Sequence, residues 1–221
     1  MRQPPHSGAP YRALWLSLLL LAAIIALTLN LLRHPLPPLH AQASVARTPA
    51  LRFVSAPSPY FRPANGRLID TVVLHYSSAI NVDASRWSDP QLDLQIFRRY
   101  HVSAHYLIDR LGTVYQLVAE QNVAYHAGGS IMPAPDNRHN VNAFSIGIEM
   151  IATADSGYTD AEYTALNALL HRIKARYTIT HIVGHEEIAG ARATSMGLRR
   201  DRKEDPGPLF DWQRMYALLQ R

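Results

Sequence analysis

The sequence predicts an α/β domain in which helices pack on the faces of a central, mixed β-sheet. Two runs of mainly β-branched and other apolar residues, 69–76 and 144–151, have the composition of buried strands. Two other segments, 89–100 and 159–177, repeat apolar residues at the spacing of an amphipathic helix. Because strands and helices intermix along the chain, the helices should cover the sheet.

A helix and a hairpin follow the first of these strands. Leu92, Ile96 and Tyr100 lie at positions i, i+4 and i+8, which places them on one face of a helix. Residues 106–109 and 113–118 are strand-like and flank an Arg-Leu-Gly tripeptide. A short connection that contains glycine is typical of a β-hairpin.

The C-terminal half supplies the longest helix. Thr159 and Glu162 have the spacing of a capping box, which marks where this helix begins. Residues 178–183 form a further strand candidate that runs into a glycine and a histidine, and residues 210–219 suit a last helix. The apolar face of the long helix should comprise Tyr163, Leu166, Leu170, Ile173 and Tyr177.

An apolar run near the N-terminus predicts export from the cytoplasm. Residues 13–32 are almost uniformly apolar, and a helix of this length spans about 30 Å, the thickness of a bilayer core. Arg2 and Arg12 precede the run, so its N-terminal end should stay in the cytoplasm. The Ala-Gln-Ala tripeptide that ends at Ala43 matches a signal-peptidase site but lies well beyond the run. We therefore favour an uncleaved membrane anchor over a signal peptide cleaved near Ala43.

Composition divides the chain into three parts. Residues 1–32 form the signal or anchor, residues 33–63 are rich in proline and alanine and suit an extended linker, and residues 64–221 form the folded domain. The absence of cysteine excludes disulfides, thiolate zinc ligands and cysteine nucleophiles. The net charge of +5 favours anionic partners such as cell-wall polymer or lipid headgroups. Since no basic face with interleaved aromatic residues appears, nucleic acid is not expected as a partner.

Two of the eleven histidines stand where predicted strands end, His75 in VVLH and His185 in HIVGH. Open sheets collect their active-site groups at such ends. A carboxylate could join them, because Pro206 disfavours a helical conformation for Asp205 and leaves it extended, with Lys203 on the same side. Two histidines and one carboxylate make a three-ligand hydrolytic zinc site with a fourth position for water. The alternative is a charged surface loop that ends at the proline.

A second carboxylate lies inside an apolar strand. In FSIGIEM, Gly147 and Glu149 face away from the isoleucines and the methionine. Because a carboxylate is costly to bury without a partner, Glu149 is either a member of an interior ion pair or a catalytic base.

Six ordered segments together closely resemble a known family: LHYSS, SAHYLIDRLGTVYQLV, AYHAGG, NAFSIGIEM, GHEEIA and RKEDPGPLFDW. The family is that of the zinc-dependent N-acetylmuramoyl-L-alanine amidases of type 2, which share their fold with peptidoglycan recognition proteins. The resemblance extends from Leu68 to Trp212 and is closest to the exported branch located in the cell envelope. It implies a single domain with the fold of a peptidoglycan recognition protein, Zn²⁺ as cofactor, peptidoglycan or muropeptides as substrate, and a periplasmic location. Residues 13–32 would supply any association with the inner membrane.

The resemblance also implies roles for seven residues. A structural hydrogen-bonding role stays equally open for the two histidines placed near the substrate. The implied roles are zinc ligation by His75, His185 and Asp205, catalysis by Glu149 and Lys203, and substrate contact by His126 and, less directly, His105.

One departure from the family pattern stands out. Asp205 follows His185 at about twice the spacing usual in similar proteins, so residues 190–201 should form a longer loop beside the metal and affect the range of substrates.

The resulting prediction is a peptidoglycan hydrolase that cleaves the amide bond between N-acetylmuramic acid and the L-alanine of the stem peptide. Two alternatives stay open: a peptidoglycan-binding module without activity, and a metallopeptidase that acts within the stem peptide. The sequence predicts no oligomeric state.

Overall fold

A six-stranded sheet organises the part of the chain that the computed structural model describes, residues 51–220. The strands are β1 (Phe53–Ser55), β3 (Thr71–Ser77), β4 (Tyr106–Ile108), β5 (Val114–Gln116), β7 (Ser145–Ile151) and β8 (His181–Gly184). The helices are α2 (Pro90–Arg99), α3 (Asp160–Lys174), α4 (His185–Ala189), α5 (Ala191–Ser195) and α6 (Trp212–Leu219). Two 3-10 turns, η1 (Ala84–Arg86) and η2 (Val141–Ala143), and a small sheet of β2 (Phe61–Arg62) and β6 (Val123–Ala124) complete the fold.

The sheet is mixed, as the sequence predicts. Its order is β1-β5-β4-β7-β3-β8, and β4, β7, β3 and β8 run parallel to their neighbours in this group. β4 and β5 form the expected antiparallel hairpin, and β1 pairs with β5 in parallel. The parallel arrangement matters for function, because it brings the C-terminal ends of β3, β7 and β8 to one edge.

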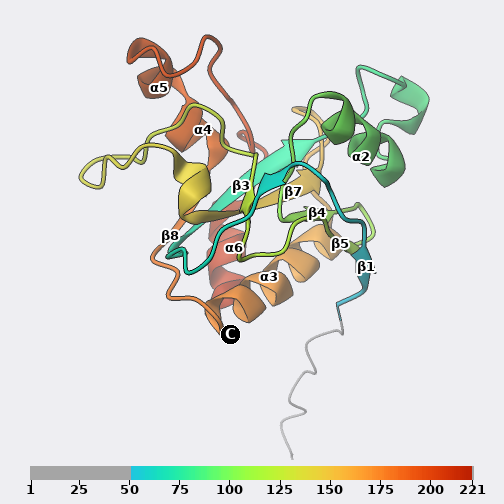
Figure 1. Ribbon diagram of the computed structural model, residues 1–221. Coiled ribbons are helices and arrows are strands. Elements are labelled where there is room, and N and C mark those ends of the chain that lie inside the picture. The colour runs from blue at the N-terminus through green and yellow to red at the C-terminus, as the bar shows by residue number, and fades with distance from the viewer. Residues whose placement is uncertain (1–50, 221) are drawn as a thin grey trace, which may run out of the picture. The chain divides into compact units, whose positions relative to one another are not determined.

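Helices cover both faces of this sheet (Figure 1). α3 and α6 pack on one face, where Ile146, Ile148 and Met150 of β7 meet Leu166 and other apolar residues of α3. On the same strand, Gly147 and Glu149 alternate with these residues and face the opposite side, toward α2 and α4. The capping box of α3 is present, with the side chains of Thr159 and Glu162 each bonded to the other's backbone amide.

The structure corrects the N-terminal border of the domain. Residues 33–63 were expected to form a linker, but β1 and β2 lie within them and Val114 of β5 pairs with Phe53. Such short strands carry no alternating pattern, and only pairing with distant strands holds them in place. Residues 13–32, the expected membrane segment, lie outside the described residues. Within residues 51–220, no helix has the length and apolar character needed to cross a membrane.

Candidate functional site

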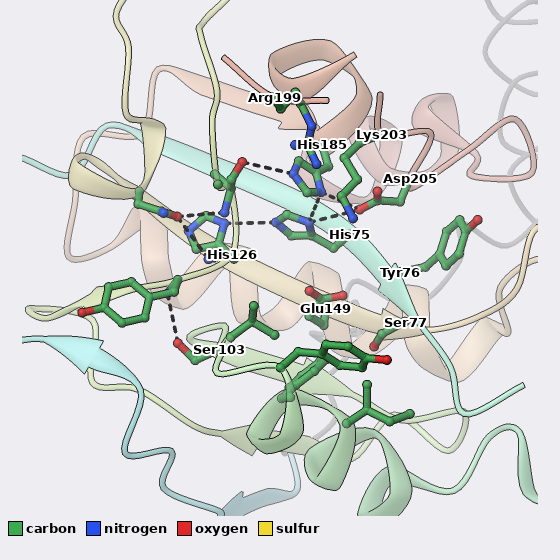
Figure 2. Close-up of a pocket in the computed structure, with 18 residues that line it drawn as sticks. His75, Tyr76, Ser77, Ser103, His126, Glu149, His185, Arg199, Lys203 and Asp205 are labelled. Carbon is green, nitrogen blue, oxygen red and sulfur yellow. Dashed lines mark hydrogen bonds and ion pairs between the residues drawn. The ribbon is translucent and has the colours of Figure 1, made fainter. Parts of the chain in front are cut away.

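Three side chains from separate elements converge at one edge of the sheet (Figure 2). His75 lies on β3, His185 is the first residue of α4 directly after β8, and Asp205 lies in the loop before α6. His75 Nδ1 is 3.0 Å from His185 Nδ1 and 3.1 Å from Asp205 Oδ2, and His185 Nδ1 is 3.0 Å from the same oxygen. All three residues are buried, and they form a group that could hold a metal ion.

A chain of hydrogen bonds fixes which nitrogen of His75 carries the hydrogen. The hydroxyl of Ser145 donates its one hydrogen to the carbonyl of Val141 at 2.7 Å, so it can only accept from His126 Nε2 at 3.2 Å. Burial holds the pKa of His126 well below its usual value, so its ring is neutral and Nδ1 is an acceptor. His75 Nε2, 3.1 Å away, must therefore donate to it, which leaves His75 Nδ1 with a lone pair.

The same reasoning applies to the second histidine. His185 Nε2 lies 3.3 Å from the carbonyl of Ala127 and must donate to it, and the tautomer with its hydrogen on Nε2 leaves a lone pair on Nδ1. Burial lowers the pKa of His75 to about 4, which keeps its ring neutral. Three acceptors therefore face one another with no hydrogen between them, an arrangement that fits a bound cation.

This donor set suits a transition metal such as zinc. Imidazole nitrogens bind zinc, copper, iron and nickel, whereas magnesium and calcium prefer sites made only of oxygen ligands. Two histidines and one carboxylate leave a fourth tetrahedral position open, as in zinc sites that hydrolyse their substrates. A zinc ion at this point would be held by His75, His185 and Asp205.

Two further ionisable side chains reach the same cavity. Glu149 lies beside His75 in the sheet register, and its Oε2 is buried with no hydrogen-bond partner in the part of the chain described. Burial first, and then the negative charge of Asp205, raises the pKa of Glu149 well above its usual value. Lys203 lines the cavity too, and Figure 2 shows both side chains directed into it. Lys203 and Asp205 both line the cavity, so their side chains lie on the same side of the RKEDPGP segment, as the sequence predicts.

The cavity has a volume of about 470 Å³ and opens between α2 and the loops around the three ligands. Ile96 and Phe97 of α2 form an apolar wall with Tyr100, which caps the helix, and Val102 continues it. Volume and lining are those of a site for a small-molecule or peptide-sized ligand.

The two histidines expected near substrate differ in whether they reach the cavity. His105 is fully buried, does not line the cavity, and accepts a hydrogen bond at Nδ1 from the amide of Gly147 at 3.0 Å. Burial lowers its pKa to about 3. His105 therefore has no face open to this cavity, and its contact with substrate stays a prediction. His126 does line the cavity, but both of its ring nitrogens are engaged by His75 and Ser145.

Sequence reasoning missed Ser145 and the reason for Gly147. Ser145 starts β7 on the same face as Gly147 and Glu149, and this alternation was the available signal. A Cβ atom at Gly147 would lie 2.4 Å from Cγ of His126, so only glycine lets that ring pack against β7.

Ser145 gives a direct test of the hydrogen-bond chain. In a Ser145→Ala variant, His126 loses the acceptor that fixes its tautomer, and His75 loses its orientation in turn. We expect the affinity for zinc to fall roughly 10- to 100-fold, as for other partners of metal-ligating histidines. Competition with a chromophoric chelator measures this affinity. The exposed Ser85→Ala variant is the control, and an unchanged affinity in Ser145→Ala would rule out the chain.

The segment after α4, which is longer than in similar proteins, is partly helical. Residues 190–201 were expected to form a loop, but Ala191–Ser195 form α5, and the turn beyond it places Arg199 on the cavity wall beside His185. The segment therefore adjoins the three ligands, as expected, with more regular structure than expected.

Comparisons with known proteins identify relatives of this chain in sequence and in fold. The sequence profile of the N-acetylmuramoyl-L-alanine amidase family matches residues 65–208. The 1,6-anhydro-N-acetylmuramyl-L-alanine amidase AmpD of Enterobacter cloacae is 41% identical over 120 residues, which cover 53% of this chain. The match spans only 57% of that relative's length.

Two solved structures show the same fold. A crystal structure of a selenomethionine derivative of AmpD has a TM-score of 0.59 and 32% identity, covering 76% of this chain and 94% of its own. The Escherichia coli amidase AmiD, in complex with anhydro-N-acetylmuramic acid-L-Ala-D-γ-Glu-L-Lys, has a TM-score of 0.54 and 30% identity, covering 71% of this chain and 60% of its own.

Proposed function

The chain belongs to the N-acetylmuramoyl-L-alanine amidase family of type 2, and we propose that it hydrolyses the amide bond between N-acetylmuramic acid and the L-alanine of the stem peptide. One observation carries this proposal: three mutually facing acceptor atoms, from His75, His185 and Asp205, border a cavity that also holds an unpartnered carboxylate. A ligand set and a base in one cavity are what hydrolysis of an amide requires.

Zinc is the proposed cofactor. When bound, a zinc ion would supply Lewis-acid polarisation of the scissile carbonyl and lower the pKa of the attacking water. His126 and Ser145 orient His75 toward the ion, and the Ala127 carbonyl orients His185.

Glu149 is the proposed general base. Its raised pKa gives the carboxylate a high affinity for the proton of the attacking water. The same carboxyl group returns this proton to the nitrogen of L-alanine as the amide bond breaks. Lys203 supplies a compact positive charge that stabilises the negative charge developing on the carbonyl oxygen.

The proposed first substrate is a 1,6-anhydro muropeptide, with L-alanine followed by γ-linked D-glutamate. This choice rests on the similarity to AmpD, which is named for the anhydro sugar, and to the AmiD complex. Intact peptidoglycan is the second substrate to compare.

We place the activity outside the cytoplasm, in the periplasm or at the inner membrane. The apolar run 13–32, with Arg2 and Arg12 before it, supports export, either as an anchor or as a signal removed near Ala43.

A product analysis tests the proposal against both alternatives. Zinc-loaded protein is incubated with purified sacculi and with soluble 1,6-anhydro muropeptides, and the products are identified by mass spectrometry. We expect an intact stem peptide with L-alanine at its N-terminus. Fragments cut inside the peptide would identify a metallopeptidase, and tight binding without any product would identify a binding module. A set of three candidate metal ligands, together with Glu149 in the lining of the cavity, supports an enzyme over the binding module.

A further inference from the structure

The segment that follows α4 carries an arginine into the cavity. Arg199 lines the cavity together with His185 and Lys203, and its side chain is drawn close to theirs in Figure 2. Its Nε donates to the carbonyl of Asp201, which orients the guanidinium. Its Nη1 is buried and has no hydrogen-bond partner among residues 51–220.

Close packing holds this arginine in position. Arg192 of α5 donates from Nη1 to the carbonyl of Met132 at 2.8 Å and ties the segment to the neighbouring loop. The carbonyl oxygen of Leu198 lies only 1.9 Å from the place that a Cβ atom at Gly129 would take. Since only glycine permits this approach, Gly129 lets the residue before Arg199 rest directly on the loop.

The unpaired guanidinium of Arg199 indicates a site that binds an anion. Within the described part of the chain, neither Arg199 nor Lys203 forms an ion pair with a carboxylate. A buried donor without an acceptor is destabilising, and such groups in native proteins have a ligand or a functional reason. Lys203 shares the cavity with Glu149 and Asp205 and is assigned to the carbonyl oxygen, so Arg199 is the group left for a further negatively charged partner.

The chemistry of the proposed substrate identifies that group, so this step rests on the proposed function. The carboxyl group of muramic acid is consumed in the scissile amide, which leaves the sugar uncharged. The negative charges lie on the stem peptide, where a γ-linked glutamate keeps its α-carboxylate free. A guanidinium fork matches a carboxylate with two parallel hydrogen bonds. We propose that Arg199 binds a stem-peptide carboxylate and so makes the enzyme prefer acidic over amidated muropeptides.

The test compares three substrates with matched variants. The substrates are anhydro-N-acetylmuramoyl-L-Ala-γ-D-Glu-L-Lys, its analogue with an amide at the glutamate α-carboxyl, and its analogue with an amide at the C-terminus. We expect Arg199→Ala to raise KM for the acidic substrate about tenfold or more, because hydrogen bonds to charged groups contribute more than neutral ones. The turnover number should change little. Arg199→Lys should give a smaller increase, since it keeps the charge but lacks the fork, and the exposed Arg200→Ala is the control.

The amidated substrates locate the carboxylate. One of the two amides should remove the effect of Arg199→Ala, and whichever does so identifies the partner group. An equal rise in KM for all three substrates, or no rise, would overturn the proposal. Calorimetry with zinc-loaded Glu149→Gln protein measures the affinity for the same three compounds and so tests this preference without turnover. If the wild-type protein cleaves none of them while that binding preference holds, the proposed function fails and the carboxylate site stands.

Discussion

Replacing Asp205 with alanine is expected to remove the bound metal and to lower turnover at least about a thousandfold. The carboxylate supplies the one negative charge of the ligand set, and its Oδ2 lies 3.1 Å and 3.0 Å from the two histidine nitrogens. Without it, only the two imidazole rings of His75 and His185 remain as ligands. Metal-assisted polarisation contributes several kcal/mol, and each 1.36 kcal/mol corresponds to a tenfold change in rate.

Metal content and turnover must fall together for this assignment to stand. Mass spectrometry of the dialysed protein gives the zinc content, and hydrolysis of the anhydro muropeptide gives the turnover. His75→Ala should behave in the same way as Asp205→Ala. Asp155→Ala removes an exposed carboxylate and should retain both zinc and activity. An Asp205→Ala protein that keeps a full equivalent of zinc would remove Asp205 from the ligand set.

The sequence predicts well those elements whose own residue pattern shows which side chains are buried. The runs 69–76 and 144–151 become β3 and β7, and the capping box marks where α3 begins. In each strand or helix one face packs on the core, and the spacing of the apolar residues along the sequence shows which face this is. β1 was missed because its three residues have no such pattern, and its place depends on pairing with β5.

The ligand set was predictable in part for the same reason. His75 lies near the end of an apolar strand and His185 directly follows another, and parallel pairing of β3 with β8 brings those strand ends together. The role of His126 could not be predicted from the sequence, because it depends on the close approach that Gly147 allows and on the hydroxyl of Ser145. Arg199 was not predictable either, since its direction depends on how α5 and Leu198 pack against a distant glycine loop.

Replacing Glu149 with glutamine is expected to keep the zinc and lower turnover by about 10²- to 10⁴-fold, the usual contribution of a general base. Glutamine has nearly the same shape, so the cavity beside His75 keeps its volume and the ligand atoms keep their distances. The amide cannot accept a proton from the attacking water. Hydrolysis of the anhydro muropeptide, quenched at set times, gives the turnover. Calorimetry gives the affinity for the muropeptide, which should change little.

The contrast between these two variants separates the base from the ligands. Glu204→Gln, at a side chain that is 68% exposed, is the matched control and should keep wild-type turnover. If Glu149→Gln lost its zinc, Glu149 would be a ligand or a structural support of the site. If it kept both zinc and turnover, the unpartnered Oε2 would need another explanation. Retained zinc, retained muropeptide binding and lost turnover together require that Glu149 acts on the proton, because every other contribution of the site is still in place.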